Sequence, residues 1–198
     1  MLTRRQFAQG TATAALTLAA APALAMIGDD ITLPPAPLPG VSIAPEFYPA
    51  VFRVKREFEP GSIIVISSQH FLYYIARKGV AIRYGVAVGK AELVFRGACS
   101  VGRKVEWPSW KHTPEMIARN PKAYKKYEDG MEGGPRNPLG ARALYLYQNG
   151  RDTAIRIHGT TEPNSIGHSV SNGCIRMVND HVIDLYDRVA IGAPVMVY

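Results

Sequence analysis

The chain has 198 residues, of which 47% are hydrophobic and 20% are charged. A disordered chain would contain fewer apolar residues and a stronger charge imbalance, so this composition predicts a packed protein with room for one catalytic domain and not for two. The formal net charge is only +7, no nucleic-acid-binding motif is present, and the run of Lys and Tyr at 122–127 is typical of a solvated helix face. We therefore expect no nucleic-acid partner.

The first 25 residues have the pattern of an export signal. Two arginines precede an apolar run at 12–21, and an A-x-A sequence follows at 23–25. The stretch 3–7, Thr-Arg-Arg-Gln-Phe, resembles the twin-arginine signal. An uncleaved membrane anchor is the alternative, but the apolar run is shorter than the roughly 20 residues that span a bilayer. We therefore expect a signal peptide at 1–25 and a periplasmic protein.

The remainder of the chain divides into a linker and one domain. Residues 26–50 are rich in proline and show no periodicity, which predicts a linker, and residues 51–198 are expected to form a single domain. Runs of strand-forming residues predict strands at 63–67, 71–76, 80–88, 94–101, 143–147, 153–157 and 194–198. Asn149-Gly150 accepts the positive φ angles of a tight turn, so it predicts a hairpin between two of them.

Only two helices are indicated. A capping residue and a proline at Thr113-Pro114 predict a short helix that ends before Pro121. Asp180 can cap a second helix, which apolar residues at helical spacing continue until Gly192. The pattern therefore predicts a mainly β domain with one or two short helices.

The chemically informative residues lie between 155 and 177. His158 ends a predicted strand, and Cys174 follows the polar turn Ser171-Asn172-Gly173. A thiolate that attacks an amide carbonyl creates an oxyanion, and the N–H groups of a glycine-containing turn can converge on it. We therefore assign the Gly173 and Cys174 N–H groups to the oxyanion. Because a free thiol is mostly protonated at neutral pH, His158 is the candidate base.

Two assignments stay open on the residues alone. Arg176 lies two positions beyond Cys174 and could hold a substrate carboxylate by paired hydrogen bonds or form a surface ion pair. Cys99 and Cys174 are the two cysteines of the chain. A disulfide between them is possible, but the polar surroundings of Cys174 favour a free thiol there.

These motifs resemble the L,D-transpeptidase catalytic domain family, also called YkuD-type. The likeness rests on His158-Gly159-Thr160 and on the stretch 171–177, Ser-Asn-Gly-Cys-Ile-Arg-Met, and it extends over about 62–198. It implies a β-sandwich-like fold with a capping segment. Whether the segment 106–136 forms a lid over the site stays open, although its length and aromatic residues are compatible with one. The likeness also implies Cys174 as nucleophile, His158 as base, and matching positions around the substrate and oxyanion for Ser171, Gly173 and Arg176.

The resemblance further implies a substrate and a chemistry. The donor would be a peptidoglycan tetrapeptide stem that loses D-alanine from a meso-diaminopimelate centre and forms a thioester, with no metal or organic cofactor. The acceptor stays open: a second stem, a free D-amino acid, an outer-membrane protein, or water as in an L,D-carboxypeptidase. Carbapenem β-lactams are expected to acylate the same cysteine.

The sequence departs from the family at two positions. Many relatives have histidine where this chain has Asn172, which can supply a polar contact but no proton at neutral pH. Many also have serine where this chain has Gly159, so a backbone carbonyl must orient the imidazole, and we assign that of Gly159.

A rival class is a non-catalytic wall-binding module that holds a metal through His158, His168 and Cys174. It lacks the close ligand pair of ordinary zinc sites. We treat the remaining histidines as surface or capping groups: His70, His112 and His181.

Overall fold

The computed structural model describes residues 30–36, 38–111, 117–118, 121 and 129–198. Strands dominate this part of the chain, which confirms the expectation of a mainly β protein. The strands are β1 (Ala50–Arg53), β2 (Ile63–Ile66), β3 (Phe71–Arg77), β4 (Val80–Gly85), β5 (Val88–Gly89), β6 (Gly97–Glu106), β7 (Arg142–Gln148), β8 (Arg151–His158), β9 (Ser169–Ser171), β10 (Ile175–Arg176) and β11 (Pro194–Val197). The helices are α3 (Asn179–Arg188) and the 3-10 turns η1 (Pro45–Phe47), η2 (Ser67–Gln69) and η4 (Pro163–Ser165).

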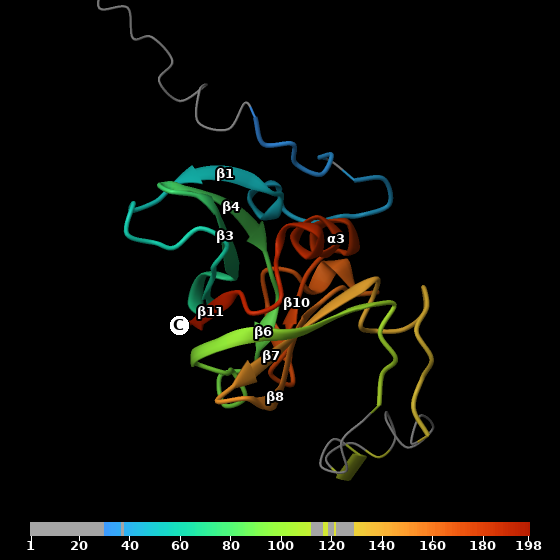
Figure 1. Ribbon diagram of the computed structural model, residues 1–198. Helices are drawn as coiled ribbons and strands as arrows, with labels where there is room; N and C mark the ends of the chain where they lie inside the picture. Colours follow the sequence, from blue (N-terminus) through green and yellow to red (C-terminus); the bar gives the residue numbers. More distant parts are fainter. Residues whose placement is uncertain (1–29, 37, 112–116, 119–120, 122–128) are drawn as a thin grey trace, which may run out of the picture.

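Nine strands form one sheet in the order β1-β4-β3-β2-β11-β6-β7-β8-β10, and β5 pairs with β9 in a second, two-stranded sheet. Neighbours in the large sheet are antiparallel except where β11 meets β2 and β10 meets β8. β11 therefore joins the two parts of the sheet, since it lies between β2 and β6. Figure 1 shows β1, β4 and β3 in one part of this curved sheet and β6, β7 and β8 in the other, the sandwich-like arrangement expected.

The larger core cluster lies between the two parts of the sheet and α3. Leu144 of β7, Ile157 of β8 and Leu185 of α3 are all fully buried in it. The hydroxyl of Tyr84 on β4 donates a 2.5 Å hydrogen bond to Asp184 on α3. The strand that carries His158, β8, and its neighbour β7 are thus supported by packed core side chains.

The β7–β8 hairpin confirms the predicted turn. Asn149 and Gly150 have φ angles of 51° and 75°, which only a few residue types adopt readily.

Several predicted elements differ in extent from the observed ones. The run at 80–88 is not one strand, because β4 ends at Gly85 and the chain then pairs β5 with β9. Gly85 lies against Phe47 so closely that a Cβ built there would be 2.4 Å from the Phe47 Cβ. On α3, the N-cap position is occupied by Val178 without a side-chain cap, and Asp180 lies in the first turn instead.

The proline-rich segment predicted as a linker packs on the domain where it is described. Leu38 is only 6% exposed and lies in a second small cluster with Ala87, Ile166 and Val178. This segment also contains the 3-10 turn η1, and β1 begins at its last residue, Ala50. Proline content could reveal neither these elements nor the contact with the domain.

Of the segment 106–136, for which the sequence left a lid role open, the structure describes 106–111, 117–118, 121 and 129–136. Trp110 and Met131 exchange two backbone hydrogen bonds, of 2.8 and 2.7 Å, so the ends run side by side. The helix predicted from Thr113-Pro114 lies largely outside the described residues, and so does His112.

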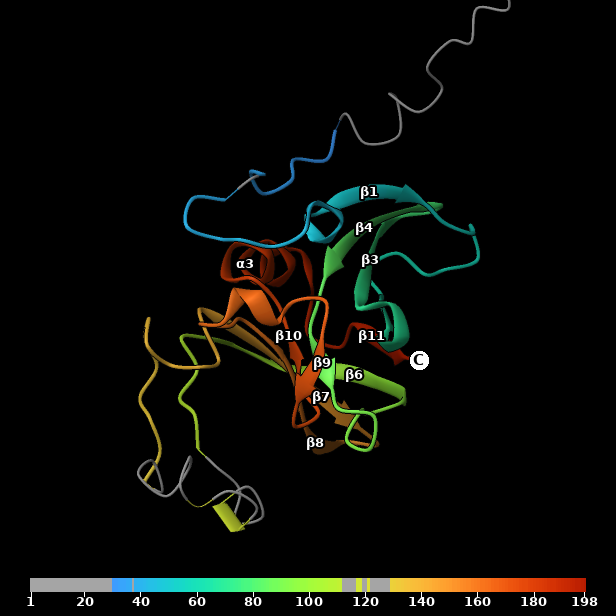
Figure 2. The same cartoon turned by 180° about the vertical axis from the view of Figure 1, so that it is seen from behind.

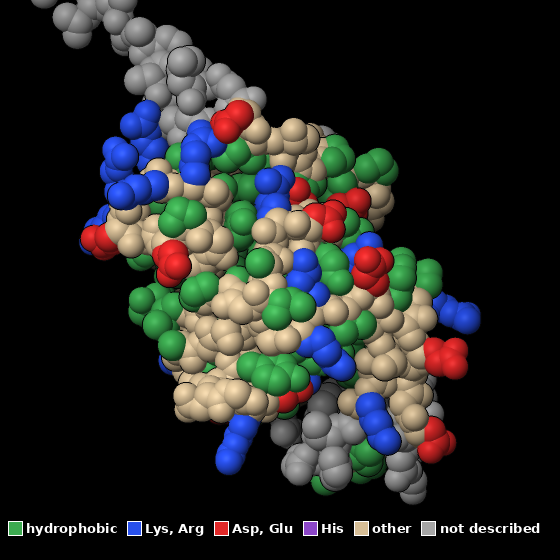
Figure 3. All heavy atoms as spheres, in the orientation of Figure 1, with side chains coloured by type: hydrophobic (Ala, Val, Ile, Leu, Met, Phe, Trp, Pro, Cys, Tyr) green, Lys and Arg blue, Asp and Glu red, His purple; other side chains and the backbone are tan. Residues whose placement is uncertain are grey.

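The surface carries a concentration of positive charge near the end of β1. Figure 3 shows Lys and Arg side chains gathered in this region of the visible face. Arg53, Arg56, Arg77 and Lys78 line a hollow of about 340 Å³ there. Within the described ranges, no helix has the length and apolar character needed to cross a bilayer.

Candidate active site

His158 is the last residue of β8 and lies between β7 and β10. It pairs with Ala143 on β7 and with Arg176 on β10, and its side chain is only 4% exposed. Its Nδ1 is 2.6 Å from the carbonyl oxygen of Gly159, the orienting contact that the sequence predicted. With Nδ1–H donating to that carbonyl, Nε2 has a free lone pair and can accept a proton.

Burial sets the protonation state of this imidazole. It lowers the pKa of His158 to about 4, against the opposing effect of the Gly159 carbonyl, so the ring is neutral at neutral pH. Gly159 has no room for a side chain, since a Cβ there would lie 2.2 Å from Asn179 Oδ1 and 3.1 Å from Gly140 Cα. The serine of many relatives would therefore require Asn179 and the loop at Gly140 to shift.

Ser171 organises the turn that carries the cysteine. Its Oγ donates to the Cys174 carbonyl oxygen at 2.5 Å and accepts the Gly173 N–H at 3.1 Å. Gly173 has a φ of 126°, and a Cβ there would lie 3.0 Å from the carbonyl oxygen of Leu93. The turn is thus fixed by its own side chain and by contact with the loop at Leu93, and Asn172 at its tip is exposed.

This geometry corrects the assignment of the oxyanion donors. The Gly173 N–H is directed at Ser171 Oγ, so it is not free to meet an oxyanion in this conformation. For the Cys174 N–H, no hydrogen bond is found within the described residues. Ser171 consequently acts on the shape of the turn, and one of the two predicted donors is left.

Cys174 directly precedes β10, which pairs with β8, the strand that ends at His158. Ile175 pairs with Ile157 in parallel register, so Cys174 lies beside Arg156, two positions before His158. Strand spacing and rise place the Cα atoms of Cys174 and His158 about 8 Å apart. The sheet therefore brings the two predicted catalytic residues together, although 16 positions separate them in the sequence.

The thiol is turned away from the imidazole in this conformation. Cys174 Sγ lies 3.8 Å from the carbonyl oxygen of Ala154, and no hydrogen bond joins it to His158 within the described residues. Burial raises the pKa of the Cys174 thiol, while the backbone N–H and guanidinium of Arg156 and the guanidinium of Arg176 oppose that rise. Cys174 and Cys99 are both free, and burial raises the pKa of Cys99 to about 11.

Arg176 makes the ion pair that was one of its two predicted roles. Its Nη1 lies 2.9 Å from Glu162 Oε2, and the two side chains are 24% and 72% exposed. The exposed carboxylate of Glu162 is a weakly held partner that a substrate carboxylate could replace.

The metal-binding alternative has no support from the geometry. His168 is exposed, and the part of the chain that the structure describes contains no group of three His, Cys, Asp or Glu residues arranged to hold a metal. His181, expected at the surface, is fully buried, which corrects that prediction.

Sequence reasoning missed an irregularity of β8 next to the cysteine. The pairs Tyr145–Arg156 and Tyr147–Asp152 place three residues of β8 opposite one of β7, and Ala154 in this bulge has a φ of 60°. The missed signal was Asp152, because Asp two residues before a backbone N–H often forms an Asx turn.

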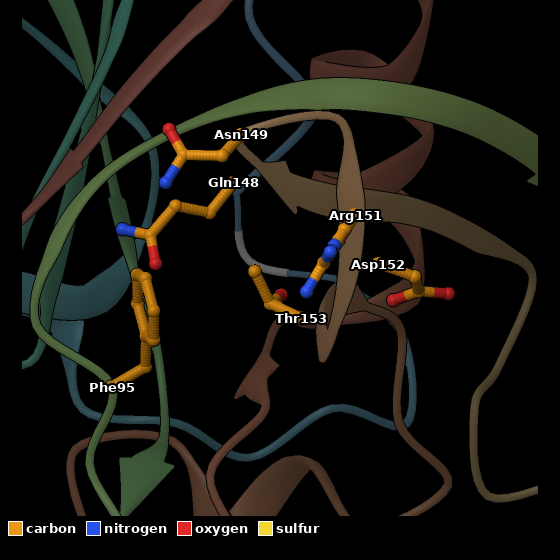
Figure 4. Close-up of a pocket in the computed structure, with 6 residues that line it drawn as sticks. All are labelled: Phe95, Gln148, Asn149, Arg151, Asp152 and Thr153. Carbon is orange, nitrogen blue, oxygen red and sulfur yellow. The ribbon is translucent and has the colours of Figure 1, made fainter.

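A pocket of about 550 Å³ opens at the start of β8, beside this bulge. Figure 4 shows the Gln148 amide next to the Phe95 ring, whereas the carboxylate of Asp152 points away from them. In Figure 2, β9 and β10, which flank the cysteine turn, lie close to one another.

Comparisons with known proteins agree on one family. A model of the L,D-transpeptidase catalytic domain, YkuD, matches residues 60–197. The Bacillus subtilis protein named "Putative L,D-transpeptidase YqjB" is 40% identical over 116 residues, which are 58% of this chain and 57% of that protein. The chain spans about half the length of the curated relatives it matches.

Two solved structures are similar in fold. A Brucella melitensis protein described as a "Probable carnitine operon oxidoreductase caia" is 49% identical, with a TM-score of 0.55 and coverage of 76% of this chain and 93% of that one. The catalytic domain of an Enterococcus faecium L,D-transpeptidase, acylated by ertapenem, is 21% identical, with a TM-score of 0.50 and coverage of 72% and 99%.

Proposed function

Because this chain belongs to the L,D-transpeptidase catalytic domain family, we propose that it is a peptidoglycan L,D-transpeptidase with Cys174 as its nucleophile. The observation that carries the proposal is that Cys174 directly precedes β10 and that β10 pairs with β8, the strand that ends at the neutral, oriented His158. Cys174 attacks the L,D-amide of a tetrapeptide stem and releases D-alanine.

In the first half of the reaction, Cys174 is the nucleophile and His158 transfers the proton. The thiol rotates from the Ala154 carbonyl towards His158 and gives its proton to Nε2. The thiolate bonds to the amide carbon, and the carbonyl oxygen becomes an oxyanion that accepts a hydrogen bond from the Cys174 N–H, an interaction typically worth about 3–4 kcal/mol. When the carbon–nitrogen bond breaks, the imidazolium returns the proton to the leaving amine of D-alanine.

The second half of the reaction transfers the acyl group. An amine acceptor attacks the thioester carbon, His158 takes the proton of that amine, and Cys174 leaves as a thiolate that is then reprotonated. The acceptor is the amine of a second stem, of a free D-amino acid or of a protein. Arg176 exchanges Glu162 for a substrate carboxylate, and exposed Asn172 offers a further polar contact.

Export and domain organisation are part of the proposal. The pattern of residues 1–25 supports a twin-arginine-type signal that directs the enzyme to the periplasm, where its substrate lies. Residues 26–50 then connect the signal to a catalytic domain at 51–198.

The decisive experiment incubates purified protein with disaccharide-tetrapeptides and identifies the products by mass. A cross-linked dimer that lacks one D-alanine is expected, and it disappears in Cys174→Ala but persists in the matched control Cys99→Ala. A product mixture of tripeptide alone would instead identify an L,D-carboxypeptidase. Full activity in Cys174→Ala, or no product from the parent protein, would refute the proposal.

The nucleophile can also be tested without the natural substrate. The proposal includes acylation of Cys174 by carbapenems, because the same thiolate and oxyanion site would open the strained ring. Incubation with ertapenem should therefore increase the intact mass of the parent and of Cys99→Ala by one adduct. An adduct on Cys174→Ala would contradict the assignment.

A further inference from the structure

The bulge in β8 holds a strained residue against the nucleophile. Ala154 has a φ of 60°, a left-handed conformation that costs an alanine about 1 kcal/mol, and its carbonyl oxygen lies 3.8 Å from Cys174 Sγ. A strained non-glycine residue persists only where its surroundings fix it, and such residues concentrate at functional sites. The question is therefore what fixes this bulge and what it does for Cys174.

The Asp152 carboxylate forms hydrogen bonds with both the backbone of the bulge and the side chain of Arg156. Its Oδ1 accepts the Ala154 N–H at 2.8 Å, which closes the turn. The same carboxylate accepts hydrogen bonds from Nη1 and Nη2 of Arg156 at 2.6 and 2.9 Å. The guanidinium of Arg156 also lies 4.0 Å over the Tyr145 ring and donates to the Ile155 carbonyl oxygen at 3.0 Å. Its position is thus set by four contacts.

Arg156 is well placed to act on the cysteine. It precedes Ile157, which pairs with Ile175, and its backbone N–H is directed at the Cys174 sulfur. Its side chain is only 17% exposed, so solvent screens its charge less than that of a surface arginine. The other charged or titratable groups that bear on Cys174 are Asp152, which opposes the thiolate, Arg176, which is paired with Glu162, and the neutral His158.

A second source of thiolate stabilisation is needed at this site. Burial lowers the pKa of His158 and raises that of Cys174, so both shifts oppose a thiolate–imidazolium pair. A fixed cation within electrostatic reach of the thiol counteracts this effect without taking part in proton transfer.

We propose that Arg156 is the cation that stabilises the Cys174 thiolate, and that Asp152 is a positioning residue that holds Arg156 and the Ala154 bulge. The importance of Arg156 for catalysis rests on the proposed function, but the effect of Arg156 on the thiol does not. Titration of the thiol without substrate therefore tests the inference separately from the transpeptidase reaction.

The experiment measures the rate of Cys174 alkylation by iodoacetamide against pH in a Cys99→Ala background, with intact mass as readout. Arg156→Gln should move the profile to higher pH and slow alkylation at pH 7 about threefold or more, because the thiolate fraction falls. Arg156→Lys, which retains a positive charge, should restore much of the rate. Arg103→Gln is the matched control, since its guanidinium lies over the same Tyr145 ring at 3.9 Å.

Asp152 is tested by two substitutions that both remove its charge. Asp152→Asn keeps an oxygen that can accept from Ala154 and Arg156, whereas Asp152→Ala keeps none. The profile of Asp152→Ala should therefore lie at higher pH than that of Asp152→Asn, and identical profiles would exclude a positioning role. An unchanged profile in Arg156→Gln, or an equal shift in Arg103→Gln, would overturn the proposal for Arg156. If the alkylation profiles of the variants shift as expected but the parent protein cross-links no stems, the result would count against the proposed function alone.

Discussion

His181 makes the stability of this protein depend on pH in a range where few other groups titrate. The side chain is fully buried on α3 between the rings of Tyr48 and Tyr84, whose centroids lie 5.9 and 6.5 Å from its own. Both of its ring nitrogens lack a hydrogen-bond partner among the described residues. Substitution of His181 by Leu, which has a similar volume, removes these two nitrogens and leaves an apolar side chain.

The size of this pH effect follows from the difference in proton binding between the folded and the unfolded state. Burial lowers the pKa of His181 from 6.5 to about 4, so between these values the unfolded chain binds a proton that the folded protein does not. Above pH 6.5, His181 is neutral in both states and protonation costs no stability. As the pH falls from 6.5 towards 4, the unfolded state gains a proton and the free energy of unfolding decreases. A difference of about 2.5 units corresponds to about 3 kcal/mol. His158, whose pKa burial also lowers to about 4, adds a loss of similar size.

Urea unfolding at a series of pH values between 7 and 4 measures this effect. Between pH 7 and 4, the free energy of unfolding of the parent should fall by about 3 kcal/mol more than that of His181→Leu. His158→Leu should still show the loss that His181 causes. Above pH 7, His181→Leu should be as stable as the parent or more stable by about 1 kcal/mol, because two unsatisfied buried nitrogens are gone. Equal pH slopes in the parent and in His181→Leu would refute the reasoning.

Two further substitutions test the support of the site and of the core. Gly89→Ala places a Cβ 2.9 Å from Gly173 Cα, so it should displace the cysteine turn and reduce acylation by ertapenem at least tenfold, with little change in the urea midpoint; full acylation would contradict this. Tyr84→Phe removes the hydroxyl that donates to Asp184, so it should lower the free energy of unfolding by about 1–3 kcal/mol in urea titrations, and an unchanged value would show that this bond is not stabilising.

The sequence predicted the two candidate catalytic residues, and it predicted the contact of His158 with the Gly159 carbonyl that the structure contains. His158 and Cys174 carry recognisable local motifs, and the glycine after the histidine was enough to assign its carbonyl as the orienting acceptor. The hairpin at Asn149-Gly150 was equally predictable, since its backbone requirement is local. Each of these features depends on residues that are neighbours in the chain.

Tertiary contacts decided the features that the motifs do not contain. The Gly173 N–H is used by Ser171 rather than left for an oxyanion, and the thiol is turned to Ala154. The burial of His181 likewise depends on α3 packing against β4 and the η1 segment.

Chain-local patterns therefore determined which residues are candidates for the proposed chemistry, because cysteine, histidine and turn motifs are recognisable from their immediate neighbours. The strand order determined how that chemistry is held. Pairing β10 with β8 brought Cys174, which directly precedes β10, close to the strand that carries Arg156 and His158. The position of β11 between β2 and β6 joined the two parts of the sheet. Such pairings connect residues far apart in the sequence, and they are selected by the packing of the whole core rather than by any one segment.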